Sequence, residues 1–432
     1  MQQLRNGAPL ALIVCVNLCT AGLTFALLAA SSLYAQTPAS HPLTLAEALE
    51  LADRQSPQLR IANALRAGAE AGTLTAKAYP NLEFNQFTGR QYLRQPSAAP
   101  GLLQHYSVGQ QIELPSVRRN RMEAALHGVA SSEHYLRESR LAVRAMVKQT
   151  FYQALRRQAE IVLAQENLKL IEDLRRRIQV QVGVGEAARL ELVRAEAEVA
   201  TARNQVRSAE LRLVTAISAL RAAIGGSPLT ESLTPVGQLD PVATLPPLDD
   251  VRTDVLARHP AVAQAITEVQ RSEARLRTEK ALRKPSPQVR AEWENQPDLG
   301  FYRFGISIPL PLWNKRQGPI AEASADVTRA SATADLRRLE LTAALERAYG
   351  QYQVASQQVV AFEQGILREA QSALQAAEAA FKFGERGIIE VLDSQRVLRS
   401  VRTDYLNAQY DRQAALIDLE QLRAIEISGI TK

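Results

Sequence analysis

The pattern of hydrophobic and polar positions contains two unusually long helical tracts. The first runs from about Val117 to Val182 with no proline and one glycine, Gly128. The second runs from about Ile320 to Phe383, also without proline, and contains two glycines. At ~1.5 Å per residue, each predicted helix is ~100 Å long. A helix of this length is not stable as an isolated surface helix, so we expect both to pack in a coiled coil or a superhelical wall.

Short runs of alternating hydrophobic and polar residues precede each tract, and this period of two predicts strands. The runs lie at Leu82–Phe87, Tyr106–Leu114, Val289–Glu294 and Tyr302–Ile308. Turn-rich segments at Gln95–Gly101 and Pro297–Gly300 separate the two members of each pair, which predicts two hairpins. Each half of the chain is therefore expected to hold a hairpin, a long helix and a shorter returning helix.

The N-terminal segment, residues 1–35, has the pattern of a secretory signal peptide. Arg5 supplies the positive charge, an apolar run extends from Leu10 to Ala30, and cleavage is expected after Ala35. The alternative is an uncleaved anchor, because the apolar run is long enough to span a bilayer. Both cysteines of the chain lie within this segment, so a cleaved protein would have neither a disulfide nor a cysteine metal site.

The predicted strands carry large apolar residues on one face and polar or charged residues on the other. In an exported chain this pattern suits a barrel with lipid outside and water inside. Four strands cannot close a barrel, since the smallest have about eight, and open sheet edges are not tolerated in lipid. We therefore expect several chains to share one barrel, and three would supply twelve strands. The alternative is a soluble pair of hairpins packed on a helix bundle.

Five features recur in the same order at offsets of roughly 200 residues, which indicates an internal duplication. In each half, a helical pattern contains a proline, Pro57 or Pro260, and the last strand run ends at a proline, Pro115 or Pro311. In the first half a helix is expected to begin near Thr44, where Glu47 can complete a capping box. The expected organisation is a first repeat at 40–224, a linker rich in glycine and proline at 225–247, and a second repeat at 248–427.

Composition argues against a nucleic-acid partner and against catalysis. The net charge of +6 arises from basic residues mixed with acidic ones along the chain. Among the five histidines only His127 and His134 lie near each other, and their spacing gives no chelate by itself. The chain contains no HExxH motif, nucleophile elbow or phosphate loop. We expect no enzymatic activity, no cofactor and no metal site.

These features together resemble the outer-membrane factor family typified by TolC. The resemblance covers residues 40–427 and includes the duplicated layout, the opening LTLAEAL from Leu43 to Leu49, the prolines that end the short helices, and the glycine turns near Gly185 and Gly384. The run from Ile306 to Gly318 most resembles the CzcC-like branch, which serves heavy-metal and related RND pumps.

The resemblance implies a mainly α fold with a membrane β-barrel, in which a homotrimer forms a twelve-stranded barrel on a long α-helical tunnel. It implies location in the cell outer membrane and the periplasm, with outer-membrane lipid, a periplasmic adaptor (membrane fusion protein) and an inner-membrane RND pump as partners. The implied function is passive export of small solutes, with divalent heavy-metal cations as a candidate cargo. The alternatives are a duct for type I secretion or drug efflux, or a periplasmic coiled-coil adaptor, although an adaptor would have one helical hairpin rather than two.

A gate at the periplasmic helix tips is also implied by the resemblance. Glu390 and Asp393 are three residues apart on one helix face, so a trimer would place them in two stacked carboxylate rings that attract cations. Arg386 matches a basic residue that holds the closed gate, and Glu191 is its candidate partner. Phe381 stands where a gating tyrosine is common. The alternative is a pair of exposed acids in ordinary surface ion pairs.

The turns that connect the helices are the remaining candidate sites. The resemblance assigns adaptor docking to the tip turns, with the candidate residues Gly183, Gly185, Gly384 and Gly387, and assigns entry to and exit from the barrel to Pro115 and Pro311.

Overall fold

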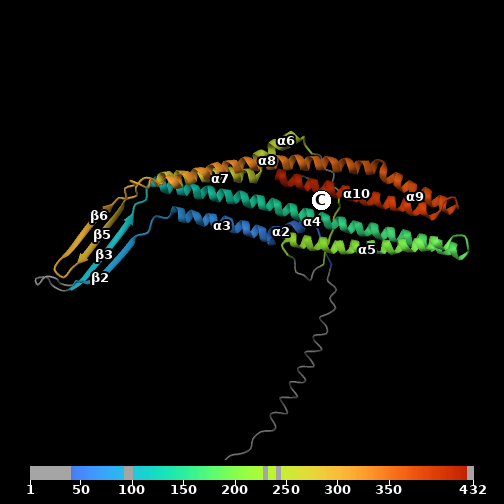
Figure 1. Cartoon of the computed structure of the whole chain (residues 1–432), viewed down its shortest axis with the longest axis horizontal. Coiled ribbons are helices and arrows are strands. Elements are labelled where there is room, and N and C mark those ends of the chain that lie inside the picture. Colours follow the sequence, from blue (N-terminus) through green and yellow to red (C-terminus); the bar gives the residue numbers. More distant parts are fainter. Residues whose placement is uncertain (1–39, 92–100, 227–231, 240–244, 426–432) are drawn as a thin grey trace, which may run out of the picture.

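The computed structural model describes residues 40–91, 101–226, 232–239 and 245–425, and it consists of a layer of long helices with a β-sheet at one end (Figure 1). The expected signal peptide lies outside the described residues, as do most of the first hairpin turn and two parts of the expected linker.

The helices follow the predicted order in both halves. The first half contains α2 (Leu45–Gln55), α3 (Pro57–Lys77), α4 (Pro115–Gly183) and α5 (Arg189–Ile224). The second half contains α6 (Leu248–Arg258), α7 (Pro260–Ala281), α8 (Gln317–Ala361), a π-helical turn η1 (Phe362–Ile366), α9 (Leu367–Lys382) and α10 (Ile388–Arg423). With 69 residues, α4 is ~100 Å long, as the proline-free tract predicts.

The long helices form one layer in which α4 has a central place. It packs against α3 and α5 on one side and against α7 and α10 on the other, and α8 and α9 pack in turn on α7 and α10. The order across the layer is therefore α3/α5, α4, α7/α10 and α8/α9. A buried cluster around Phe151 and Leu416 joins the two halves near the middle of α4. This packing explains how helices too long to be stable alone are held.

The capping box predicted at the start of the first helix is confirmed. The Glu47 backbone N–H donates to Thr44 Oγ1 at 3.3 Å, and the Thr44 N–H donates to Glu47 Oε2 at 2.9 Å. Pro57 then begins α3, where a proline removes no hydrogen bond because the first helical N–H groups have no partner within the helix.

One predicted helix differs from the structure. The second tract was expected to be uninterrupted, but η1 inserts a five-residue π-helical turn between α8 and α9. Contacts from α10 accompany this turn: the Tyr405 hydroxyl donates to Glu363 Oε1 at 2.9 Å, and the Phe362 and Tyr405 ring centroids are 5.8 Å apart. A π turn keeps the helical hydrogen bonding while it accommodates an extra residue, so sequence composition alone does not reveal it.

The four predicted strands form one antiparallel sheet in the order β2-β3-β5-β6. Their bounds are β2 (Glu83–Gln91), β3 (Gly101–Gln111), β5 (Gln288–Asn295) and β6 (Gly300–Ser307). The β3–β5 pairing joins the hairpins of the two halves side by side. Within the described part of the chain, β2 and β6 each have one unpaired edge.

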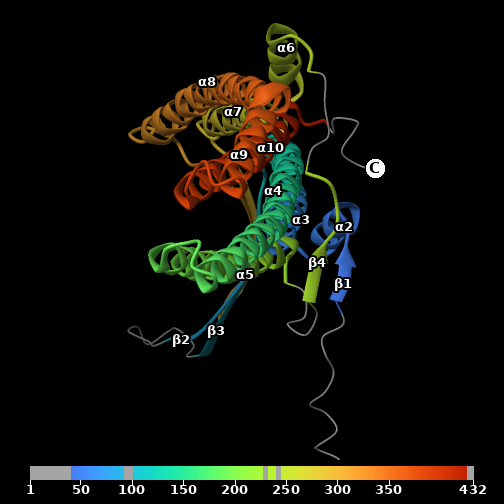
Figure 2. The same cartoon turned by 90° about the vertical axis from the view of Figure 1, so that its right-hand side faces the viewer.

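A second, small sheet was missed by the sequence analysis. Two four-residue strands, β1 (Ser40–Leu43) and β4 (Ser232–Pro235), pair in parallel beside the middle of the helical layer. Figure 2 shows β1, β4 and α2 on one side of the layer, whereas the turn between α4 and α5 and the turn between α9 and α10 lie toward the other side. These strands are too short for a period-two pattern to be recognised, and β4 lies in the segment expected to be a linker.

Candidate pore and gate surfaces

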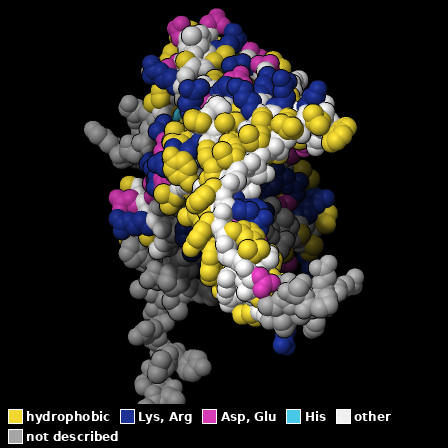
Figure 3. Space-filling view, turned by 90° about the vertical axis from the view of Figure 1, so that its left-hand side faces the viewer, with side chains coloured by type: hydrophobic (Ala, Val, Ile, Leu, Met, Phe, Trp, Pro, Cys, Tyr) yellow, Lys and Arg dark blue, Asp and Glu magenta, His cyan; other side chains and the backbone are white. Residues whose placement is uncertain are grey.

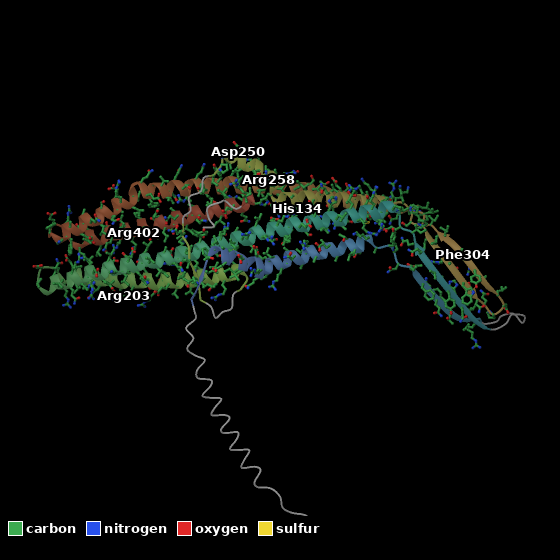
Figure 4. The ribbon with its side chains drawn as sticks, turned by 180° about the vertical axis from the view of Figure 1, so that it is seen from behind. His134, Arg203, Asp250, Arg258, Phe304 and Arg402 are labelled. Carbon is green, nitrogen blue, oxygen red and sulfur yellow. The ribbon has the colours of Figure 1, made fainter. Side chains whose placement is uncertain are left out.

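One face of the four-stranded sheet is covered by exposed apolar side chains. The strand register places Phe84, Val108, Ala291 and Phe304 in one row across the sheet. Phe84 is 65% exposed and Phe304 is 85% exposed. In the next row the Tyr106 and Trp293 rings stack with centroids 5.2 Å apart. Figure 3 views the sheet end of the molecule, where hydrophobic side chains gather in a band, and Figure 4 shows Phe304 on this sheet.

The other face of the sheet carries a network of charges. Arg303 lies 2.5 Å from a Glu294 oxygen and 3.5 Å from a Glu292 oxygen, and Arg290 lies 3.7 Å from Glu292. His105 Nδ1 lies 3.6 Å from Glu294. The sheet therefore has the two-faced character that its sequence predicts, with one apolar surface and one surface of paired charges.

Two arginines join the ends of α3 and α4, the helices that flank the first hairpin. Pro115 occupies the first turn of α4, and Arg118 and Arg121 follow on the same helix face. Arg118 donates to the Lys77 carbonyl at 3.0 Å, and Arg121 donates to the Ala78 carbonyl at 3.0 Å. These bonds satisfy carbonyls at the end of α3, which have no partner within that helix. Neither arginine was predicted from the sequence, although their three-residue spacing directly after Pro115 indicates a shared helix face.

The second hairpin has a different connection to the helices. Pro311 lies in the loop before α8, and Arg316 ends that loop with a left-handed backbone, φ 59°. The Arg316 guanidinium reaches Glu279 Oε2 of α7 at 2.5 Å. An ion pair between the loop and α7 thus replaces the arginine–carbonyl contacts of the first half.

The two helix turns at the far end of the layer share one geometry. Gly185 and Gly384 both have positive φ, 82° and 74°. After each glycine, the next N–H donates back into the preceding helix, from Glu186 to the Gln181 carbonyl at 2.8 Å and from Glu385 to the Ala380 carbonyl at 2.9 Å. This left-handed capping pattern needs glycine because other residues lose energy at positive φ. Gly183 ends α4, and Gly387 is the N-cap of α10.

The predicted gate residues lie around the second of these turns. Arg386 Nη1 is 3.8 Å from Glu390 Oε1 across one helical turn, and both side chains are exposed. Asp393 is exposed on the same side of α10, one turn further along. Glu191 lies in the first turn of α5, and the described residues contain no ion pair between it and Arg386. Within one chain, Arg386 therefore has Glu390 as its acidic neighbour.

Phe381 is half-buried beneath the tip turn, where it packs against an apolar cluster that joins the two helical hairpins. This tip cluster includes Ile178 of α4 and Ile388 of α10, each nearly fully buried. By contrast, Phe383 is 76% exposed two residues later. Phe381 thus contributes to the apolar packing of the tip. This contribution does not require the hydroxyl group that a tyrosine would have.

Ion pairs link the hairpins above the tip cluster. Arg396 of α10 pairs with Glu198 of α5, and Arg402 of α10 lies 3.4 Å from Glu166 of α4. Figure 4 shows Arg402 on the upper hairpin and Arg203 on the lower one. The partners in these pairs are more than 190 residues apart in sequence, so the pairs could not be predicted from the sequence.

Two features are absent from the described residues. No described helix contains an 18-residue stretch apolar enough to cross a bilayer. No group of three or more histidine, cysteine, aspartate or glutamate side chains in the described part of the chain is arranged to hold a metal ion.

Comparison with known proteins identifies the family. The profile of the outer membrane efflux protein family matches residues 48–226 and 251–424. The chain belongs to the outer membrane efflux protein family. It is accordingly a transport protein of the outer membrane that extends into the periplasm, and not an enzyme.

Relatives of this efflux protein include metal-resistance proteins. The cobalt-zinc-cadmium resistance protein CzcC of Cupriavidus metallidurans is 26% identical over 85% of this chain and 87% of its own length. The nickel-cobalt-cadmium resistance protein NccC of Alcaligenes xylosoxydans is 28% identical over 76% of this chain and 74% of its own length. Both relatives are thus resistance proteins for heavy metals.

Solved structures show the same fold. CusC, described as a transmembrane channel, superposes with a TM-score of 0.78 at 18% identity, covering 91% of this chain and 96% of that one. The outer membrane channel MtrE of Neisseria gonorrhoeae, solved in an open state, gives a TM-score of 0.75 at 20% identity and covers 90% of each chain. The expected fold class, with long helices and four antiparallel strands, is thereby confirmed.

Proposed function

We propose that three copies of this efflux protein form a closed duct whose twelve strands span the outer membrane and whose helices enclose a periplasmic tunnel. The observation that carries this proposal is the four-stranded sheet, with one exposed apolar face, one charged face and free edges on β2 and β6. Such edges need partners in lipid, because no water is present there to pair with the free backbone groups. Two further copies would supply these partners and close the barrel.

The helical layer supports the same assembly. Its outermost helices expose large apolar side chains that a monomer in water would not keep exposed. Ile61 and Leu65 of α3 are 59% and 53% exposed, and Leu336 and Leu339 of α8 are 53% and 69% exposed. Packing of α8 of one copy against α3 of the next would cover both sets. The repeats at 40–224 and 248–427 would then alternate around the tunnel.

The cargo and partners follow from the relatives. Similarity to CzcC and NccC supports export of small solutes, with divalent heavy-metal cations as the cargo class. In this proposal a periplasmic adaptor docks at the tips around Gly183, Gly185, Gly384 and Gly387, and an inner-membrane RND pump supplies the cargo. The duct itself needs no metal-binding cluster, because passive conduction requires sites from which ions leave easily.

The gate is proposed at the tips of the same tunnel. Glu390 and Asp393 of three chains would form two carboxylate rings, and Arg386 would hold them together at rest. In the assembled duct, Glu191 of the first hairpin is the proposed second partner of Arg386. Phe381 would stabilise the packing of the helices that carry these charged residues.

Three measurements test the duct. The mature protein, extracted from outer membranes in detergent, is expected to have the mass of a trimer by light scattering and to conduct ions in planar bilayers. A cysteine pair such as Leu65→Cys with Leu336→Cys is expected to cross-link neighbouring chains under oxidation. A monomer that neither conducts nor cross-links, or a protein found in the inner membrane, would contradict the proposal.

A further inference from the structure

The apolar face of the sheet continues beyond the end of β6, into the connection that leads to α8. Every second residue from Tyr302 to Leu312 is a large apolar side chain, and each is more than half exposed. These residues are Tyr302, Phe304, Ile306, Ile308, Leu310 and Leu312. Trp313 follows them and is 89% exposed. Because β6 ends at Ser307, the second half of this apolar row lies outside the paired strands.

The polar residues of the same connection are bonded within the protein. The Asn314 side chain accepts from the Arg316 N–H at 2.9 Å, and the Gln317 side chain accepts from the Lys315 N–H at 3.0 Å. The Arg316 guanidinium also pairs with Glu279 of α7. The loop thus uses its polar groups for internal bonds and leaves its apolar side chains exposed. An exposed apolar row of this kind marks a surface that meets a partner or a membrane.

The length of β6 indicates that lipid covers part of this row. A strand that crosses a bilayer at a tilt of ~45° has ~9–11 residues. β6 has 8 residues, and the next three, through Leu310, complete the spanning length. Pro309 and Pro311 lack a backbone N–H, so the segment beyond the sheet has fewer donors to leave unpaired in lipid. Trp313 then lies at the periplasmic boundary of the apolar layer.

Aromatic side chains stand at this boundary on both edges of the sheet. Trp and Tyr favour the headgroup level of a membrane because their rings are apolar at one end and polar at the other. Trp313 follows β6 at one edge, and Tyr79 precedes β2 at the other edge, where it is 67% exposed. The Arg118 guanidinium lies 4.3 Å from the centroid of the Tyr79 ring. The junction of sheet and helices therefore has the composition of a membrane interface (Figure 1).

The same junction carries basic side chains that ion pairs do not neutralise. Four exposed basic residues form no ion pair with another described residue. They are Lys77, Arg283, Lys284 and Lys315. Glu113 and Glu279 of the junction are paired with arginines, and Glu83 lies on the charged face of the sheet. Free positive charge at this level attracts the phosphates of anionic headgroups.

We propose that the loop from Leu310 to Lys315 inserts into the headgroup layer on the periplasmic side of the outer membrane, with Trp313 among the headgroups and Lys315 beside anionic phosphates. The partner is a phospholipid surface, because the loop is continuous with the apolar face of the sheet. The inference rests on the proposed duct, in which the sheet spans the outer membrane, and adds the level at which that membrane ends. A neighbouring copy is the competing occupant, since β2 of the next chain would lie at this edge of the barrel.

The test uses the mature protein with Trp313 as its only indole. The chain contains two tryptophans, so Trp293→Phe leaves Trp313 as the single reporter. The protein is reconstituted in vesicles of phosphatidylethanolamine and phosphatidylglycerol, with acyl chains brominated either near the headgroup or near the chain end. Quenching of Trp313 emission is expected to be about twofold stronger with bromine near the headgroup. Acrylamide in the water is expected to quench Trp313 about threefold less than it quenches N-acetyltryptophanamide.

The matched control carries its indole at the opposite end of the molecule. Trp293→Phe, Trp313→Phe and Phe383→Trp together place the only tryptophan at the helix tips, where Phe383 is 76% exposed. Neither brominated lipid is expected to quench this indole. At ~1.5 Å per residue, the 69 residues of α4 separate the tips from the sheet by ~100 Å.

A second variant tests the headgroup contact. In the Trp293→Phe background, Lys315→Glu is expected to raise acrylamide quenching of Trp313 about twofold in vesicles with phosphatidylglycerol, because like charges repel. The change is expected to be smaller in vesicles of phosphatidylcholine alone. Lys382→Glu makes the same charge change at the helix tips and should leave the quenching unchanged.

The outcomes separate this inference from the duct itself. Free quenching by acrylamide would show that the loop lies in water, and shielding from acrylamide without quenching by either brominated lipid would show that a neighbouring copy covers it. Stronger quenching from the chain end would put the loop inside the bilayer, and an equal response to Lys315→Glu in both kinds of vesicle would exclude a contact with anionic headgroups. Each of these results overturns the inference while trimer mass and bilayer conductance remain. Loss of both in the wild type would overturn the duct and the inference with it.

Discussion

Lys148 of α4 and Glu420 of α10 form an ion pair at 2.7 Å, with side chains only 6% and 5% exposed. The two residues are 272 positions apart in sequence, so the pair joins the first half of the chain to the second. Beside it, burial and the Glu420 charge raise the pKa of the Tyr152 hydroxyl to about 12. The pair thus lies in a poorly solvated environment at the centre of the layer, where an unpaired charge would be costly.

Removal of one partner is therefore expected to destabilise the protein strongly. Glu420→Met leaves the Lys148 ammonium buried without its carboxylate, and a loss of ~3–5 kcal/mol is expected. Lys148→Met with Glu420→Met should recover most of that loss, because a well-packed apolar pair replaces the two charges. The measurement is the temperature at which helical circular dichroism is lost at a fixed heating rate. Equal stability of the single and double variants would contradict this interpretation.

His259 predicts a dependence of stability on pH. It is buried at the N-cap of α7, where its Nδ1 accepts from the Ala261 N–H at 3.2 Å. Burial lowers its pKa, and a backbone hydrogen bond with Gln421 only partly opposes that shift. Above an unfolded pKa of about 6.5 both states are neutral. As pH falls below that value, the unfolded chain takes up a proton before the folded one, so stability decreases until the folded pKa is reached.

The matching variant is His259→Asn, which keeps an N-cap side chain but does not titrate. Its thermal stability relative to the wild type is expected to improve as pH falls from 7.5 to 5. If the thermal stability of His259→Asn and of the wild type changed equally with pH, the role given to His259 would be contradicted.

Two glycines with positive φ should differ in their tolerance of alanine. At Gly384 a Cβ would meet nothing within 4 Å, so Gly384→Ala is expected to cost only the ~1–2 kcal/mol of a left-handed backbone. At Gly225, φ is 102° and a Cβ would lie 2.8 Å from the Gln55 carbonyl oxygen. Gly225→Ala should therefore lower the thermal midpoint more than Gly384→Ala does. The reverse order would show that the close approach of α5 to α2 is relieved by other means.

The order of helices and strands in this protein could be predicted from sequence because the patterns that indicate these elements extend over many residues. A tract without proline across Val117 to Val182 permits little except a helix, and the period of two places Phe84 and Phe304 on one sheet face. The capping box at Thr44 is equally local, because both partners lie within one turn. Each of these features depends on neighbours in sequence.

The features that could not be predicted depend on contacts between distant segments. Lys148 looks like any lysine on a charged helix until α10 brings Glu420 beside it. The π turn at Phe362–Ile366 contacts Tyr405, which is 42 residues from its partner Glu363 in sequence. The amino-acid composition of a helix gives no information about such a contact. For the proposed gate, the sequence indicates candidate residues. How these residues pair between copies depends on how the chains assemble.

The carboxylates of the proposed gate are expected to control ion selectivity. Glu390→Gln with Asp393→Asn removes two acids per chain, and the ion pair of Glu390 with Arg386 is exposed, so little stability is lost. If these residues ring the tunnel, the cation-to-anion permeability ratio in planar bilayers should fall at least threefold, and block by a trivalent cation should weaken about tenfold, because local negative potential concentrates cations. Glu369→Gln with Glu378→Gln removes two exposed acids from α9 of the same hairpin and should leave both quantities unchanged. Unchanged selectivity and block in the α10 variant, or equal changes in the α9 control, would rule out the carboxylate rings and leave Glu390 and Asp393 as ordinary surface acids.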